Sequence, residues 1–161
     1  MEETIITFET SKLAKEKGFD ILQHSYYFED GEFKEHSITG TNGYYGEEYE
    51  FNLSEFNENW NNKWLTKKNG DRCFGCSKDK GYFETFSAPT QSLLQKWLRE
   101  VHKINILYTV HQTNGNVITY DYCLHLPYGF QSTITPWSQL NYNTYEEALE
   151  IGLQEALKLI K

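Results

Sequence analysis

The C-terminal half of the chain carries two runs in which every second residue is apolar. These runs cover residues 104–110 and 118–126, and a period of two predicts a strand with one apolar face for each. An Asn-Gly-Asn segment lies between them, which is typical of a hairpin. If both apolar sets face one side, Val110 pairs with Tyr120 and a three-residue loop remains. A two-residue turn would place the apolar sets on opposite faces, so the three-residue loop is preferred.

Two further segments show helical periodicity and helix-end signals. The first runs from about Phe8 to Lys17, with Thr7 as its cap and Gly18 placed to end it. The second begins within residues 87–90, where a proline is tolerated in the first turn. Its apolar residues fall at i, i+3, i+4 and i+7, which predicts one buried face: Leu94, Trp97, Leu98 and Val101.

A last helix gives the clearest signal in the chain. Thr144 is followed three residues later by Glu147, the spacing of a capping box. One continuous apolar stripe then follows: Tyr145, Ala148, Leu149, Gly152, Leu153, Ala156, Leu157 and Ile160. Gly152 lies on the stripe itself, where the missing side chain lets a neighbour approach closely.

The N-terminal half is dominated by strand and turn signals. Residues 26–28 and 33–38 predict the arms of a hairpin around a Glu-Asp-Gly-Glu turn, and residues 50–53 are a further strand candidate. The Asn- and Gly-rich region at about 57–86 is irregular and is interpreted as inserted or peripheral. The order of elements predicts an α+β protein: an antiparallel sheet with three helices packed mainly on one face, as a single domain over residues 1–161.

Composition limits the possible settings of the protein. The 161 residues carry a net charge of −8, and the first 60 hold 14 Asp/Glu against 4 Lys/Arg. This balance argues against general nucleic-acid binding, although each charged segment is also explained as a solvated face. No apolar run reaches the ~20 residues of a membrane span, and the acidic N-terminus lacks the layout of a signal peptide. With an odd number of cysteines, three, these features predict a cytoplasmic protein.

Four residues are candidate ligands for a structural zinc ion. Cys73 and Cys76 have the spacing of a zinc knuckle in a Gly-containing turn. Cys123 and His125 lie two apart on a predicted strand and therefore share a face, the polar one. Together they have the composition of a Cys3His site. The alternative is that the first pair are ordinary turn residues and that Cys123 is a small, semi-buried filler.

A basic and aromatic stretch is the candidate site for an anionic ligand. Cations interleaved with aromatic rings hold phosphates and stack bases, and aromatics make up 16% of the chain. The candidate residues are Tyr44, Tyr45, Tyr49, Trp60, Lys63, Trp64, Lys67, Lys68 and Arg72. The alternative is a solvated loop whose tryptophans anchor it in the core.

Catalytic motifs are missing from the sequence. There is no P-loop, dinucleotide-binding glycine fingerprint, His-Glu-x-x-His pair or Gly-x-Ser-x-Gly elbow. Asp121, Cys123 and His125 have the residue types of a nucleophilic triad. At two-residue steps along one strand their side chains stand about 6–7 Å apart, too far for a direct relay. An enzymatic function is therefore the least favoured class.

Three segments carry a resemblance to a known group of proteins. They are residues 8–19, residues 87–100 (SAPTQSLLQKWLRE) and residues 143–160 (NTYEEALEIGLQEALKLI). The chain resembles small uncharacterised proteins of gut bacteria, their prophages and their phages, over the first ~20 residues and roughly residues 87–161. The resemblance implies a phage or mobile-element setting, and it does not extend to Cys73 or Cys76.

The resemblance and the candidate residues together lead to three functional hypotheses. The first is a non-enzymatic phage or prophage accessory protein that binds a host factor to counter host defence, through its acidic N-terminal third, with a DNA-mimic inhibitor as one version. The second is a sponge for a nucleotide or another small anionic ligand, held by the basic and aromatic residues. The third is a zinc-stapled structural or adaptor domain.

Overall fold

The chain forms an α+β protein with antiparallel sheets. The computed structural model describes residues 3–21, 25–35, 64–66, 72–74, 83–112, 118–126, 131–132 and 141–161. The chain divides into two compact units, residues 1–18 with 89–161, and residues 19–88. Each unit is treated by itself below.

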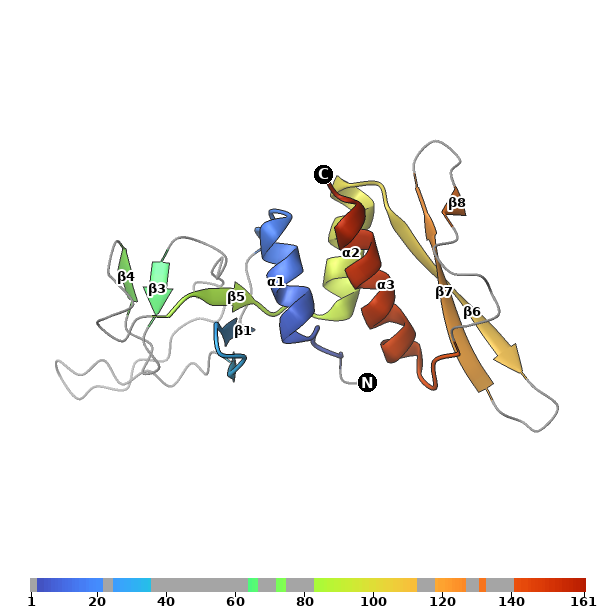
Figure 1. Ribbon diagram of the computed structural model, residues 1–161, viewed down its shortest axis with the longest axis horizontal. Helices are drawn as coiled ribbons and strands as arrows, with labels where there is room; N and C mark the ends of the chain where they lie inside the picture. The colour runs from blue at the N-terminus through green and yellow to red at the C-terminus, as the bar shows by residue number, and fades with distance from the viewer. Residues whose placement is uncertain are drawn as a thin grey trace. The chain divides into compact units, whose positions relative to one another are not determined.

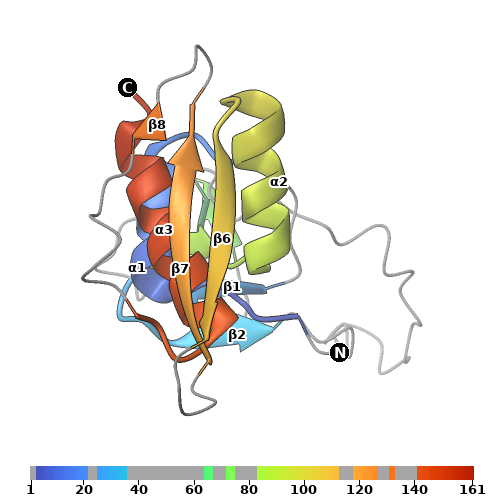
Figure 2. The same cartoon turned by 90° about the vertical axis from the view of Figure 1, so that its right-hand side faces the viewer.

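Within its described residues, the first unit contains three helices and one sheet. Its elements are α1 (Phe8–Glu16), α2 (Gln91–Val101), β6 (Asn105–Gln112), β7 (Ile118–His125), β8 (Gln131–Ser132) and α3 (Tyr145–Leu159). The strands form an antiparallel sheet in the order β6-β7-β8. All three helices lie on the same side of this sheet, with α2 and α3 between it and α1 (Figures 1 and 2). The predicted placement of the helices on one face is therefore seen in this unit.

The register of the β6–β7 hairpin confirms the sequence prediction. Val110 pairs with Tyr120, and the ladder continues without a break to Asn105 opposite His125. Even-numbered side chains of both strands therefore share one face. Ile106 is among those that pack under α3, so this face is the one toward the helices. The connecting residues 113–117 lie outside the described residues, so the predicted loop length stays a prediction.

Helix α3 packs directly on the sheet at its glycine. A Cβ added at Gly152 would lie 3.0 Å from Cγ2 of Ile106 and 3.2 Å from Cδ2 of Tyr122. The rest of the predicted stripe is buried from Ala148 to Leu157. The close approach predicted at this glycine is therefore confirmed.

The caps of all three helices are threonines. The Thr7, Thr90 and Thr144 side chains accept hydrogen bonds from the third residue of their helices. Gly18, after α1, has φ +83°, which a glycine adopts without strain. Helix α2 departs from the prediction at both ends. Its cap is Thr90, so Pro89 precedes the helix rather than lying in its first turn, and Val101 is 58% exposed rather than buried.

The described residues of the second unit form short strands. β1 (Ser25–Phe28) lies between β2 (Phe33–Glu35) and β5 (Thr85–Ser87) in one antiparallel sheet. β3 (Trp64–Thr66) and β4 (Arg72–Phe74) form a separate antiparallel pair. The predicted hairpin is confirmed for β1 and β2, which turn at Gly31 with φ +84°.

The region predicted to be irregular, about 57–86, contains β3, β4 and the start of β5. A strand of three residues is too short to show an alternating pattern, and the asparagines and glycines around these strands indicate turns instead. The predicted strand at 50–53 lies outside the described residues, as do residues 36–38 of the predicted hairpin. Within the described ranges, each helix is too short or too polar to cross a membrane.

Candidate functional site

The far half of the β6–β7 hairpin exposes large apolar side chains. Tyr108 is 55% exposed, Val110 52% and Ile118 50%. All three are even-numbered, so they lie on the face that the helices cover further along the hairpin. We call these three residues the distal apolar face. The sequence pattern predicted that they share one apolar face, which the register confirms, but it does not show that helices leave this part of the face uncovered.

The distal apolar face starts at the first turn of α3. The Tyr145 ring packs edge-on against the Tyr108 ring, with centroids 4.7 Å apart. Burial, followed by the neighbouring Tyr108 and Glu146, raises the pKa of Tyr145, so its hydroxyl stays protonated at neutral pH. On the covered side of this contact, Ile106, Tyr122 and other residues beneath α3 are buried. The hairpin thus extends past the end of the helix that shields it.

Strand β6 also has a free edge within the described residues, because its only described partner is β7. Helix α2 runs beside this edge in Figure 2. There the Gln95 Nε2 atom donates a 3.0 Å hydrogen bond to the Ile106 carbonyl. This contact gives the outward-pointing carbonyl at the start of β6 a hydrogen-bond partner. It also shows that the Ile106 carbonyl points away from β7.

Apart from Leu107, which is 53% exposed, the opposite face of the hairpin is polar and partly buried. Asp121 and Thr119 are buried, Cys123 is half-buried and His125 is exposed. Thr119 Oγ1 donates a hydrogen bond to Asn141 Oδ1 over 3.2 Å, and Asp121 Oδ1 accepts one from the Tyr122 amide over 2.8 Å. These contacts are those of a packed polar surface rather than of an acid–base relay.

The predicted zinc ligands are placed only in part. Cys123 and His125 lie on one face of β7, as predicted, opposite Leu107 and Asn105. Cys73 lies in strand β4, paired with Leu65 rather than in a turn, and Cys76 is outside the described residues. Among the described residues, no three His, Cys, Asp or Glu side chains are grouped to hold a metal ion.

The predicted residues for an anionic ligand fall almost wholly outside the described part of the chain. Trp64 begins strand β3 and Arg72 begins β4, two pairs apart in the same ladder. The other candidates are not described: Tyr44, Tyr45, Tyr49, Trp60, Lys63, Lys67 and Lys68. The nucleotide hypothesis therefore stays a prediction.

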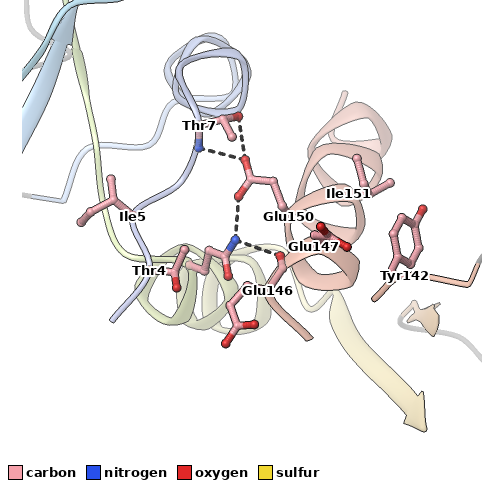
Figure 3. Close-up of a pocket in the computed structure, with 9 residues that line it drawn as sticks. Thr4, Ile5, Thr7, Tyr142, Glu146, Glu147, Glu150 and Ile151 are labelled. Atoms are coloured by element: carbon pink, nitrogen blue, oxygen red, sulfur yellow. Dashed lines mark hydrogen bonds between the residues drawn. The ribbon is translucent and has the colours of Figure 1, made fainter. Parts of the chain in front are cut away.

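A pocket of about 460 Å³ opens where the N-terminal segment, α2 and α3 meet. Three of its lining residues are glutamates on one side of α3: Glu146, Glu147 and Glu150 (Figure 3). Ile5, Ile151 and Tyr142 supply apolar walls. The carboxylates disfavour an anion in this pocket, because like charges repel at short range.

Glu150 is the buried centre of the pocket wall. Its Oε1 accepts from the Thr7 amide at 2.9 Å, from the Thr7 hydroxyl at 2.7 Å and from the Thr10 hydroxyl. Its Oε2 accepts from Gln91 Nε2 at 2.9 Å (Figure 3). The carboxylate therefore joins the N-termini of α1 and α2 to α3, where helix dipoles also favour a negative charge. Through these four hydrogen bonds, Glu150 links helices α1, α2 and α3.

Sequence reasoning missed both features for identifiable reasons. Alternation shows which face of a strand a residue occupies, but not whether another element covers that face. Glu150 reads as an ordinary polar position of an amphipathic helix, and its threonine partners are 140 and 143 residues away. A possible signal was the pair of threonines at 7 and 10, which supplies two hydroxyls at the start of α1.

Comparison with known proteins gives no match to a family model, to a curated protein or to a solved structure.

Proposed function

We propose that this protein is a non-enzymatic binding module that docks a partner protein on the distal apolar face. The observation that carries the proposal is the exposure of Tyr108, Val110 and Ile118, each half or more uncovered, on one side of a two-stranded ribbon. Full burial of a valine or isoleucine side chain contributes on the order of 1.5–3 kcal/mol, and a half-exposed one gains about half of this. Three neighbours of this size are enough for the centre of an interface.

The charge of the chain defines the partner further. The protein carries −8 overall, and the exposed Glu146 stands at the start of α3, next to Tyr145. A partner whose apolar side chains are surrounded by lysine or arginine is complementary to this apolar face and its negative charge. In the phage or prophage setting that the sequence resemblance implies, that partner is a host protein.

The test compares two variants in which an apolar side chain of similar exposure is replaced by serine. Ile118→Ser alters the distal apolar face, whereas Leu107→Ser alters the opposite face at 53% exposure. The tagged full chain is incubated with bacterial host extract, and retained proteins are quantified by mass spectrometry. A partner identified in this way is then purified and titrated by calorimetry against each variant.

We expect Ile118→Ser to weaken the partner's affinity about tenfold or more and Leu107→Ser to leave it unchanged. We also expect affinity to fall as salt rises, because the charged rim is screened. Equal binding by wild type and Ile118→Ser, with both proteins folded by circular dichroism, would refute docking on this face.

The nucleotide or anionic-ligand hypothesis is the second candidate from the sequence, and the described pocket does not favour it. Three glutamates line that pocket, so an anion would need the basic residues Lys63, Lys67 and Lys68 instead. Thermal melting with and without nucleotides distinguishes the two hypotheses, since a ligand of the folded state raises the melting temperature. A shift abolished by Lys67→Ala with Lys68→Ala would favour the sponge.

A further inference from the structure

The hydrogen-bond pattern of the sheet shows which backbone groups β6 presents at its free edge. Tyr120 exchanges two backbone hydrogen bonds with Tyr142, at 2.9 and 3.0 Å, on the side of β7 away from β6. The Val110–Tyr120 pair is therefore not hydrogen-bonded within the β6–β7 ladder, and Val110 points its N–H and C=O outward. The alternation makes Tyr108 and Gln112 do the same. The bond from Gln95 to the Ile106 carbonyl follows the same alternation.

Within the described residues, the part of the edge from Tyr108 to Gln112 carries no charged side chain, proline or bulge that would oppose strand pairing. Edge strands are commonly defended by charged side chains, proline or bulges. β6 spans eight residues with no lysine, arginine, aspartate, glutamate or proline, and it pairs with β7 without a bulge. In a chain with 24% charged residues, this strand without charged side chains carries three exposed apolar ones, Leu107, Tyr108 and Val110, which suits it to a further partner.

We propose that a second copy of this chain pairs antiparallel with β6, on a two-fold axis that passes Thr109. In that register Tyr108 of each copy lies opposite Val110 of the other, and the outward N–H and C=O groups of both residues are satisfied. Four backbone hydrogen bonds form, because each of the two equivalent pairs exchanges two. Thr109 faces its own counterpart, and the two three-stranded sheets become one of six strands.

The strand's own chemistry favours a copy of itself over an unrelated strand. An isologous contact needs a surface that is complementary to itself. The Tyr108–Val110 register supplies an aromatic side chain opposite a β-branched one twice over, a favourable cross-strand pair. The strand carries no charge that would repel its copy, although each whole chain carries −8. Only the long-range repulsion between the two chains therefore opposes pairing, and salt screens this repulsion.

The proposal rests on the same hairpin as the proposed function and deepens it. Two-fold pairing places the distal apolar faces of both copies on one side of the joined sheet, so the assembly offers two docking sites to one partner or to two. Avidity would then strengthen binding without any new contact.

Sedimentation velocity of the full chain, over about two decades of concentration, measures the association. We expect a monomer–dimer equilibrium whose dissociation constant falls several-fold between low and high salt, opposite to the salt response expected of the host complex. A wild-type protein that stays monomeric over the whole range would overturn the proposal.

Val110→Pro is the decisive variant, because it removes an N–H that points away from β7 and leaves the hairpin ladder in place. We expect it to be monomeric, and the matched control Val110→Thr, which keeps the N–H and the branched side chain, to dimerise. If Val110→Pro unfolds, Val110→Lys keeps the backbone and adds the missing edge charge, with an expected loss of at least about tenfold in dimer affinity. A dimer that survives these changes would exclude the β6 edge.

Ile118→Ser separates this proposal from the proposed function. Ile118 is on β7, away from the free edge, so its variant is expected to dimerise normally while losing the host partner. Loss of the dimer in Ile118→Ser would contradict the edge register. Retention of the host partner by that variant would contradict the docking face alone.

Discussion

Gly152 lies so close to Ile106 that a Cβ at the glycine would stand 3.0 Å from the isoleucine Cγ2 atom. Tyr122 closes the other side, with ring carbons at 3.2 and 3.3 Å. Helix α3 therefore rests on the sheet through its backbone at this point. The spacing between helix and sheet is set by the absence of one side chain.

Gly152→Ala is expected to destabilise the protein by up to about 2 kcal/mol. An alanine gains about 1 kcal/mol of helix propensity over glycine. Forcing a methyl group into a packed core costs about 1–3 kcal/mol, and here both neighbours are held by the sheet. The free energy of unfolding in urea, wild type against variant, measures the balance.

A double-mutant cycle identifies the contact behind that loss. Ile106→Ala removes Cγ2 and makes room for the new methyl group, so the two changes together should cost less than the sum of the single costs. A stabilised Gly152→Ala protein, or strict additivity in the cycle, would show that the close contact relaxes without penalty.

Glu150→Gln is expected to destabilise the protein by about 2 kcal/mol. The carboxylate accepts from Thr7, Thr10 and Gln91, whereas an amide must turn its own donors toward one of these groups. Glu147→Gln is the matched control on the same helix, because Glu147 is exposed and accepts from the Asn143 amide at the surface. Equal melting temperatures for the two variants would show that the hydrogen bonds of Glu150 do not stabilise the packing of the three helices.

The sequence was sufficient for those parts of the fold that depend on neighbouring residues. Thr7 and Thr144 cap the helices they were predicted to cap, because a cap hydroxyl reaches only three residues ahead. The Val110–Tyr120 register was predictable because alternation and loop length together allow few alternatives. Both inferences needed no knowledge of distant contacts.

The parts that failed depend on contacts between distant segments. Ile118 continues the alternating pattern of β7 and lies on its apolar face, but whether a strand residue on that face is covered depends on where α3 begins. Glu150 is buried because residues 143 positions away supply its donors. No local period records either fact, so the candidate site came from the structure.

Lys103→Gly is expected to stabilise the protein by about 1 kcal/mol. Lys103 follows the last turn of α2 with φ +59°, a left-handed conformation that costs a residue with a Cβ about 1–2 kcal/mol. Glycine adopts it freely, although the 2.8 Å bond from the lysine Nζ to the Glu100 carbonyl is lost at the exposed surface. The melting temperature should rise, and a fall would mean that the lysine contact outweighs the strain.

His102 should make the protein lose stability in mild acid. Burial lowers the pKa of His102, and its ring packs edge-on against Trp97 with centroids 4.5 Å apart. As pH falls below about 6.5 the unfolded chain takes up a proton that the folded protein does not, so the free energy of unfolding falls until the folded pKa is passed. His102→Phe keeps an aromatic ring and removes the titrating imidazole, so its urea midpoint should fall less than that of wild type between pH 7.5 and pH 5.

Lys103→Gly is the control, because it changes the adjacent residue, leaves the imidazole in place and should follow the wild-type pH dependence. Parallel curves for wild type and His102→Phe would assign the acid response to other groups.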